Sequence, residues 1–426
     1  MNSLATFPYI LFVGIVYITM LMILVAAHEL GHYLFARLFG MGAEEFSIGM
    51  FGKKPIAILG RRRYTVPVLP GEDPEIRGDE SNVLEGGGAT IVPTVETTED
   101  GKTVLHETTL FTIRPWPVGG FVRIKGMVPQ EDGGEIHIPG GFFSKAPWKR
   151  WIVLAAGPAF SVLAGIVLLV PFLMFYGLGR ATTVVKDAPT TGAAYKAGIR
   201  GGDRVTSIDG TVVDDWYAMV RRVRDHGTSP ITVGIDREGK PLSMTFRGDY
   251  DKAPSAVQDA DGAPTGERRR QTRLGVQILS ENRPLPFAKA VPMAAKIPVF
   301  AALDFVDRII HPSTLVESVG GPGTMIKATS DSIQEGFWPV VRLAALLSIS
   351  VGIFNLLPIP PLDGGQMWIA VAEMLRRGRR LSMKTQVRVL NVGFALVAAI
   401  IAGILLVDAG RLTGLTPAPG ATQEKK

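Results

Sequence analysis

The sequence contains no cysteine, and only 20% of its 426 residues are charged. Without cysteine there can be no disulfide bridge, no thiolate metal site and no cysteine nucleophile. Any metal must therefore be held by nitrogen or oxygen atoms, of which histidine contributes few, because it occurs only six times. The formal net charge of +6 is modest, and the basic residues cluster beside long apolar runs. That distribution indicates a membrane topology signal and gives no reason to expect a nucleic-acid partner.

Four charge-free runs are each about 18 residues or longer, which is enough for a helix to cross the hydrocarbon core of a bilayer. They cover Met1–Ala27, Trp151–Gly179, Leu343–Leu362 and Leu390–Val407. The first run could also be a cleavable signal peptide, but it has no basic start, no A-x-A cleavage pattern and too long an apolar stretch. The expected fold is an α-helical polytopic membrane protein with about four transmembrane helices.

Basic residues follow the first run, precede the second and separate the third from the fourth, whereas the N-terminus has none. They are Arg37, Lys53, Lys54, Arg61–Arg63, Lys145, Lys149, Arg150, Arg376, Arg377, Arg379, Arg380, Lys384 and Arg388. By the positive-inside rule, residues of about 40–150 and 364–389 face the cytoplasm, and the segment of about 180–340 lies outside. The sequence thus predicts a multi-pass protein of the inner or plasma membrane.

The outer segment has the pattern of a small α+β domain. Strands are expected at 184–185, 204–208, 231–235, 242–246 and 274–278, with helices at 193–197 and 214–224. Asp214 or Asp215 is a candidate N-cap of the second helix. The order of elements, and the run Lys196-Ala197-Gly198-Ile199 followed by Gly202-Asp203, resemble a PDZ domain of the circularly permuted bacterial type. Polar residues 249–273 predict a flexible insertion.

Two further segments have recognisable patterns. Thr- and Val-rich residues 89–99 and 102–113 flank Asp100-Gly101, which predicts a β-hairpin. Residues Pro286–Ile310 form a moderately amphipathic stretch that could lie along the outer membrane surface, although Pro292 and Pro298 interrupt it.

His28-Glu29-Leu30-Gly31-His32 is an H-E-x-x-H motif at the inner end of the first apolar run. Residues four apart share a helix face, so both imidazoles can bind one metal ion while Glu29 faces a water. A buried polar cluster that only stabilises packing is the alternative. Ionisable residues at membrane depth are costly, however, and usually functional. The motif therefore predicts a zinc site with Glu29 as the catalytic base.

Such a site needs a third protein ligand, and Asp363 is the foremost candidate. It follows Asn355 in the run Asn-Leu-Leu-Pro-Ile-Pro-Pro-Leu-Asp-Gly-Gly, whose prolines must break the third helix at its cytoplasmic end. The alternative explanation of this run is an ordinary helix end that is capped by Asp363 and the following glycine. The predicted topology brings the H-E-x-x-H motif and Asp363 into the same leaflet, so a shared site near the cytoplasmic side is expected.

These motifs together resemble the site-2 protease family of intramembrane zinc metalloproteases, in particular the bacterial regulator-of-sigma-factor branch. The resemblance rests on H-E-x-x-H in the first span, N-x-x-P-x-x-x-L-D-G in the third, and a PDZ-like domain between. Residues 45–49 resemble the family's membrane-associated β-hairpin, and residues 117–122 its P-x-G-G-[FY]-V segment. After Gly157-Pro158 the family usually has an asparagine, where this sequence has Ser161.

The resemblance implies a zinc-dependent endopeptidase that cleaves transmembrane segments of membrane proteins, such as anti-sigma factors or remnant signal peptides. His28, His32 and Asp363 would hold Zn²⁺. Substrate contacts are expected from Asn355 and Pro358, and from strand pairing along Phe46, Ser47, Ile48 and Gly49. The PDZ domain would either capture a free C-terminus or act as a steric gate. A catalytically silent scaffold and a metal-dependent transporter are alternatives, but the motif is intact and no internal repeat is present.

The lipid bilayer is an expected partner of the protein, and the sequence does not determine the oligomeric state. The expected domain organisation has eight parts. The parts are 1–40, first transmembrane helix with H-E-x-x-H; 41–147, cytoplasmic membrane-associated β region; 148–179, second transmembrane helix; 180–285, PDZ domain; 286–337, amphipathic segment; 338–375, third transmembrane helix with the L-D-G-G motif; 376–410, basic connection and fourth transmembrane helix; and 411–426, polar tail.

Overall fold

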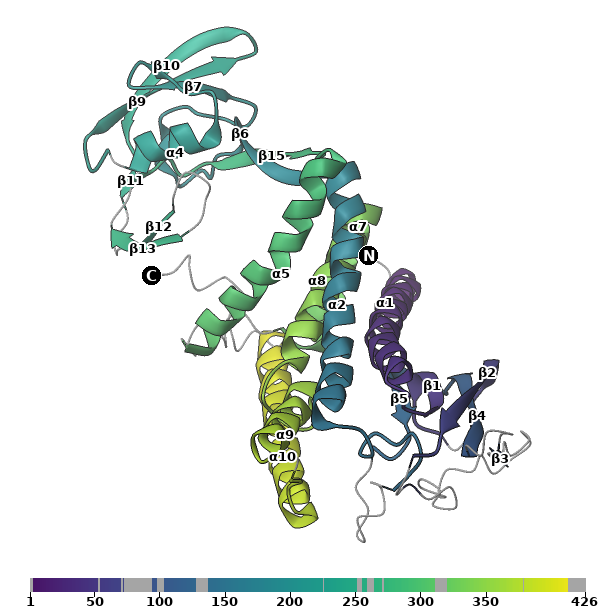
Figure 1. Ribbon diagram of the computed structural model, residues 1–426. Coiled ribbons are helices and arrows are strands. Elements are labelled where there is room, and N and C mark those ends of the chain that lie inside the picture. Colours follow the sequence, from purple (N-terminus) through teal and green to yellow (C-terminus); the bar gives the residue numbers. More distant parts are fainter. Residues whose placement is uncertain are drawn as a thin grey trace. The chain divides into compact units, whose positions relative to one another are not determined.

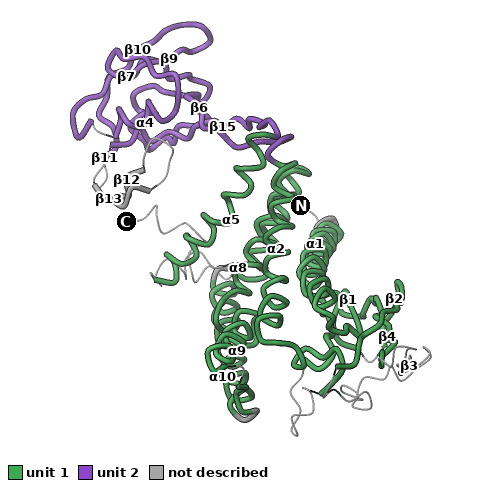
Figure 2. The backbone as a smooth tube through the Cα atoms, viewed as in Figure 1, with its two compact units in different colours: residues 1–172, 288–420 green, residues 173–287, 421–426 purple. Residues whose placement is uncertain are grey.

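A computed structural model describes residues 3–52, 54–69, 72, 94–97, 103–127, 137–224, 226–250, 255–258, 264–269, 272–310, 320–377 and 379–412. The chain forms two compact units, residues 1–172 with 288–420 and residues 173–287 with 421–426 (Figure 2). The first unit holds the long helices and a β-sheet, and the second is a smaller domain inserted between two of those helices (Figure 1).

Among the described residues, four helices of the first unit are long and apolar enough to cross a membrane. They are α1 (Ser3–Leu38), α2 (Pro147–Phe175), α8 (Phe337–Asn355) and α10 (Met383–Leu412). Large apolar side chains on them face outward; Leu406, for example, is 74% exposed. Apolar surface of this extent is rare in a protein that is surrounded by water. The prediction of about four apolar membrane-length helices is confirmed.

The third apolar segment is broken at its proline run, as the sequence predicts. Helix α8 ends at Asn355, and a separate helix α9 (Asp363–Leu375) begins at the aspartate itself. The prolines at 358, 360 and 361 lack the N–H groups that a continuous helix requires. A Cβ atom on Gly364 would lie 2.3 Å from the carbonyl oxygen of Leu357, so glycine lets the loop fold back onto the first turn of α9.

Two more helices precede α8 in the part of the chain that the structure describes. Helix α5 (Phe287–Ile310) covers the predicted amphipathic stretch in spite of its two internal prolines. Helix α7 (Pro322–Glu335) has no counterpart in the predictions. Asp408 of α10 accepts hydrogen bonds from the backbone N–H groups of Gly323 and Thr324, at 2.7 and 3.2 Å, and so caps the first turn of α7. An anionic side chain is favourable there because the first N–H groups of a helix have no partner within it.

The sheet of the first unit lies beside the end of α1 (Figure 1). Its strands are β1 (Ala43–Met50), β2 (Ala57–Pro67), β3 (Thr94–Thr97), β4 (Thr103–Ile113) and β5 (Trp116–Ile124). The order is β2-β4-β1-β5, and β3 also pairs with β4. The predicted hairpin of β3 and β4 is confirmed by the antiparallel register that sets Thr97 opposite Thr103. Its turn lies outside the described residues.

Strand β1 is an inner strand, which corrects the prediction that residues 45–49 form a hairpin whose edge binds substrate. Phe46 is opposite Phe111 in the parallel pairing with β4 and opposite Val122 in the antiparallel pairing with β5. Both edges of β1 are therefore occupied, and no further strand can add there. Strand β5 pairs with β1 on one side only, among the strands that the structure describes.

The second unit has a sheet of order β10-β9-β7-β6-β15, with β8 beside β7. Its elements are β6 (Leu178–Asp187), α3 (Ala193–Lys196), β7 (Arg204–Ile208), β8 (Thr211–Val212), α4 (Trp216–Arg224), β9 (Pro230–Arg237), β10 (Lys240–Arg247) and β15 (Gln277–Arg283). Every predicted strand and helix of this domain has a counterpart, although the last strand begins three residues later than 274. Asp215 is the N-cap of α4, because its Oδ1 accepts the N–H of Ala218 at 2.7 Å.

The predicted flexible insertion at 249–273 contains short paired strands among its described residues. Strand β11 (Asp249–Tyr250) pairs with β14 (Thr272–Arg273), and β12 (Ser255–Gln258) pairs with β13 (Pro264–Arg269). Backbone hydrogen bonds thus give part of this segment a defined structure, which its polar composition does not predict.

Candidate metal centre

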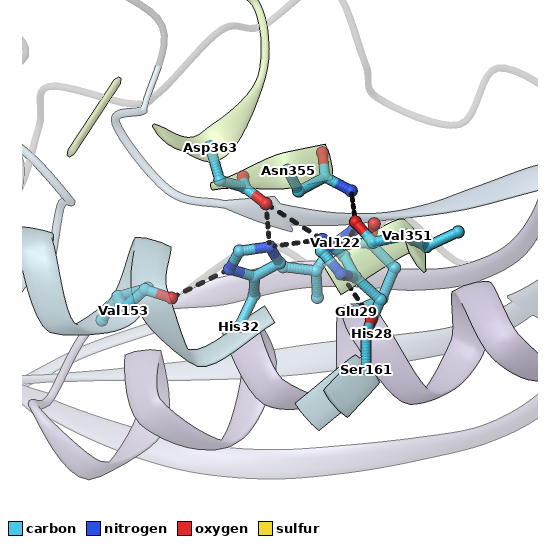
Figure 3. A network of polar contacts seen from close by, with 9 residues as sticks. All are labelled: His28, Glu29, His32, Val122, Val153, Ser161, Val351, Asn355 and Asp363. Carbon is cyan, nitrogen blue, oxygen red and sulfur yellow. Dashed lines mark hydrogen bonds and ion pairs between the residues drawn. The ribbon is translucent and has the colours of Figure 1, made fainter. Parts of the chain in front are cut away.

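Helix α1 places the two motif histidines one turn apart on the same face. The Nε2 atoms of His28 and His32 are 3.2 Å apart, and each residue is only 7% exposed (Figure 3). Side chains at i and i+4 are neighbours on a helix, so this arrangement follows directly from the sequence spacing.

Asp363 comes from the first residue of α9, 335 residues along the chain from His28. Its Oδ2 lies 3.0 Å from Nε2 of His28 and 3.4 Å from Nε2 of His32. No other group of three possible ligand residues comes this close together within the described ranges. The structure therefore brings together the three residues that the sequence nominates as metal ligands.

The spacing of the three atoms fits a zinc ion. Zinc binds imidazole nitrogen and carboxylate oxygen at about 2.0–2.1 Å in tetrahedral geometry, which separates neighbouring ligand atoms by about 3.3 Å. The observed separations are 3.0, 3.2 and 3.4 Å. With three protein ligands, a tetrahedral ion keeps a fourth position for water, as catalytic zinc sites do.

Helix α2 orients both imidazoles through their other nitrogen atoms. Nδ1 of His32 donates to the carbonyl oxygen of Val153 at 2.9 Å, since a carbonyl can only accept. Nδ1 of His28 lies 2.9 Å from the hydroxyl of Ser161. A proton on Nδ1 leaves the lone pair of Nε2 for the metal. Ser161 stands where the family that the sequence resembles usually has an asparagine. Its hydroxyl thus contacts one of the two histidine ligands directly.

Gly157 allows α2 to pass close to the metal cluster. A Cβ atom there would lie 2.2 Å from Nε2 of His32 and 2.8 Å from Nε2 of His28, closer than van der Waals contact allows. Sequence reasoning noted Gly157-Pro158 only as a family feature. The need for glycine arises from helix packing, which the local sequence does not show.

Gly157→Ala should therefore prevent zinc binding. The added methyl group would displace the two imidazoles at the nitrogen atoms that bind the ion, so we expect an affinity loss of at least about 100-fold, the upper end of what outer-shell changes alone produce. Gly14→Ala is the matched control, because a Cβ atom at Gly14 of α1 meets nothing within 4 Å. Zinc titration of both purified variants tests this. Normal zinc affinity in Gly157→Ala would contradict the location of the site.

Glu29 faces a cavity of about 300 Å³ that is shared with the metal cluster. Its Oε2 accepts the backbone N–H of Val122 in β5 at 2.9 Å (Figure 3). The cavity walls come from α1, β5, α2, α8 and the loop before α9. The lining residues are Val25, His28, Glu29, His32, Val122, Ile124, Met127, Val153, Leu154, Val351, Asn355, Pro361, Leu362 and Asp363.

The predicted substrate-contact residues divide into two groups. Asn355 lines the cavity, and its Nδ2 donates to the carbonyl oxygen of Val351 at 3.0 Å, the helix-satisfying role that its position also allows. Pro358 lies in the loop after α8 but is not part of the cavity wall, to which Pro361 and Leu362 contribute instead.

Phe46, Ser47, Ile48 and Gly49 lie away from the cavity. Phe46 is packed against Tyr33 and Phe111, with ring centroids at 6.0 and 5.6 Å. Ser47 is 1% exposed, and the edge of β1 on either side is paired. These residues belong to β1, the strand next to β5 in the same sheet, and its two paired edges contradict the predicted strand pairing of substrate along them. The hydrogen bond from the N–H of Val122 in β5 to Glu29 was not predicted from the sequence.

Comparison with known proteins identifies proteases among the relatives of this chain. The regulator of sigma-W protease RasP of Bacillus subtilis is 27% identical, over 91% of this chain and 96% of its own length. Zinc metalloprotease RasP of Shouchella clausii is 26% identical, over 93% and 98%. The PDZ domain of an SdrC-like protein from Listeria monocytogenes covers 24% of this chain and 90% of its own, with 14% identity and a TM-score of 0.16, too low to decide the domain type.

The sequence pattern of Peptidase family M50 matches residues 16–82 and 101–400. The first matched segment contains His28, Glu29 and His32, and the second contains Asp363, so the match includes every member of the metal cluster. The matched segments together span well over half of the chain. The protein belongs to Peptidase family M50, the site-2 protease family.

Proposed function

We propose that this protein is an intramembrane endopeptidase that cleaves transmembrane segments of other membrane proteins. The chain is a zinc metalloprotease, as its family and its relatives' names indicate. The observation that carries the proposal is the meeting of His28, His32 and Asp363 beside Glu29. His28, Glu29 and His32 lie on a helix that is apolar and long enough to span a bilayer, where ionisable side chains are rarely without function.

In this proposal His28, His32 and Asp363 hold the zinc ion. A zinc ion bound there would supply an acidified water at neutral pH and a positive charge to polarise the scissile carbonyl group. The backbone N–H of Val122 donates a hydrogen bond to Oε2 of Glu29. The other carboxylate oxygen, Oε1, is then the one that takes the proton of the attacking water. Glu29 then returns that proton to the leaving amine. The backbone N–H of Val122 fixes the position of this carboxylate in the cavity wall.

Substrate must reach this cavity in an extended form, because the carbonyl groups of a helix are already hydrogen-bonded and shielded. We infer that the unwound segment lies along the outer edge of β5. The N–H of Val122 donates to Glu29 and not to β1, so this edge of β5 lies beside the catalytic glutamate. Strand addition to such an edge supplies affinity through main-chain hydrogen bonds. Asn355 and the loop after α8, with Pro358, are further candidates for holding the segment.

The distribution of basic residues supports a cytoplasmic location for the sheet and for residues 376–380, with the second unit outside. Because the chain has no cysteine, single cysteines report location without background. Thr211→Cys in the second unit should react with an impermeant reagent in intact cells, whereas Ser382→Cys should react only after lysis. Both positions are exposed in the structure. The reverse labelling pattern would overturn the proposed orientation.

We further propose that the second unit is a PDZ domain that acts as a steric gate, with capture of a free C-terminus as the other possibility. Leu178 to Ala181 of β6 pair with Ser280 to Arg283 of β15, so the two ends of the domain meet. Residues 180–281 can therefore be replaced by a short glycine linker between Gly179 and Asn282.

A gate predicts that this excision admits bulky, uncleaved substrates while small substrates are cut at the normal rate. Cleavage of one membrane helix, with and without a large extracytoplasmic domain, measures the size limit. An unchanged limit would exclude the gate and favour peptide capture.

The substrate class rests on the relatives. The Bacillus subtilis relative is named a regulator of sigma-W protease, which supports membrane-bound anti-sigma factors as substrates of this chain. Remnant signal peptides, like the membrane segments of anti-sigma factors, are apolar helices that must unwind before cleavage, so they belong to the same proposed substrate class. The direct test of the proposal is cleavage of a model transmembrane helix by the purified full chain in detergent. Cleavage should stop on chelation and return with zinc, and cleavage that persists in chelator would refute it.

A further inference from the structure

Arg150 and Glu373 form an ion pair that is fully enclosed by the protein. Arg150 is 3% exposed and Glu373 is 0% exposed, and Nη2 of the arginine lies 2.5 Å from Oε2 of the glutamate. The arginine Nε also donates to the carbonyl oxygen of Lys145 at 3.2 Å. Oε1 of Glu373 has no hydrogen-bond partner among the described residues. The pair therefore carries a desolvation cost that its hydrogen bonds do not fully offset.

The pair joins the two helices that meet at the metal cluster. Arg150 is in the first turn of α2, three residues before Val153, whose carbonyl oxygen orients His32. Glu373 is in the last turns of α9, whose first residue is Asp363. Figure 1 shows α9 beside the beginning of α2. One helix thus holds the histidines in place and the other delivers the carboxylate.

Helix α9 packs Met367 against the apolar core that contains Val153 and Leu154. Its buried positions are Gly364, Gly365, Ala370 and Glu373, so Glu373 is the one large side chain among them. Trp368 and Leu375 are 60% and 81% exposed. The loop fixes the helix at Asp363, and Glu373 fixes it ten residues further on, which is about 15 Å at the rise of an α-helix. Two fixed points set the direction of the helix axis.

We propose that the Arg150–Glu373 pair is a positioning device for the metal centre, which sets α9 against α2 so that Asp363 meets His28 and His32. An apolar pair of similar volume would stabilise the fold equally well or better. What an ion pair adds is a defined distance and direction. Functional groups must be held to within about 0.5 Å, so a small pivot of α9 is enough to weaken the site. This inference rests on the proposed function.

The test compares zinc affinity with thermal stability in full-length protein in detergent. Glu373→Gln should weaken zinc binding by about tenfold or more, the range that supporting residues around metal ligands produce. Its cobalt-substituted form should show an altered ligand-field absorption spectrum. Glu45→Gln is the matched control, because Glu45 is also buried and ion-paired, with Arg114 at 2.8 Å, but lies in the sheet. It should lower Tm and leave zinc affinity within about twofold.

The double variant Arg150→Met/Glu373→Leu separates positioning from stability even if the single variant does not fold. Its Tm should be near the wild-type value, because apolar replacement of a buried pair is often neutral. Its zinc affinity should remain reduced. Zinc affinity that stays normal in Glu373→Gln, or that recovers with Tm in the double variant, would overturn the positioning role. Failure of the wild-type protein to bind zinc would instead refute the proposed function.

Discussion

Glu29→Gln should abolish proteolysis while the zinc content of the protein stays close to that of the wild type. The glutamine carbonyl oxygen can still accept the N–H of Val122, which holds Oε2 of the glutamate at 2.9 Å. Its amide nitrogen then stands where Oε1 was and cannot take up a proton. Loss of a general base typically lowers the rate by about 10²–10⁴. The measurements are the cleavage rate of a model membrane helix and the zinc-to-protein ratio of the same sample.

The two readouts separate the roles that Glu29 could have. Loss of activity with full zinc content assigns Glu29 to the chemistry. Loss of zinc in the same variant would mean that Glu29 coordinates the ion or organises its ligands, and another base would be needed. Activity close to that of the wild type would remove Glu29 from the mechanism altogether.

Asp363→Ala should instead empty the site. The substitution leaves two neutral imidazoles, whose Nε2 atoms are 3.2 Å apart, and removes the anionic third ligand. We expect zinc affinity to fall by at least about 100-fold, since the loss of a direct ligand should exceed the 10–100-fold effects of outer-shell partners. Zinc competition against a chelator measures this, and proteolysis should be lost in parallel.

The exposed residue Asp304 provides the control for Asp363. It is an aspartate in α5 that pairs with Arg308 at 2.6 Å and lies outside the metal cluster. Asp304→Ala should keep normal zinc affinity, which excludes a general effect of lost negative charge. Full zinc affinity in Asp363→Ala would place the third ligand elsewhere in the chain.

The local part of the site could be predicted from the sequence because it depends on helix spacing. His28 and His32 are four residues apart, and that fixes their shared face. Asp363 could be predicted as the third metal ligand because the apolar runs and their basic flanks predict that both motifs lie in the same leaflet. The strands of the second unit were likewise evident from alternation and turn residues.

The remaining part depends on which elements pack together, and local patterns do not encode that. The family resemblance predicts a β-hairpin at residues 45–49, but it does not show that β4 and β5 occupy both edges of β1. Gly157 matters because α2 approaches the two imidazoles, and Val153 acts through a backbone oxygen that any residue would supply. Arg150 and Glu373 are 223 residues apart, and nothing in either neighbourhood pairs them.

The central claim is that two imidazoles and one carboxylate hold the zinc ion, and X-ray absorption at the zinc edge tests it most directly. Purified full-length protein should show two imidazole ligands with only oxygen in the remaining positions, at about 2.0–2.1 Å. The imidazole contribution should persist in Glu29→Gln. A first shell with three or more imidazoles would require one of the other four histidines as a ligand and would contradict the assignment of Asp363.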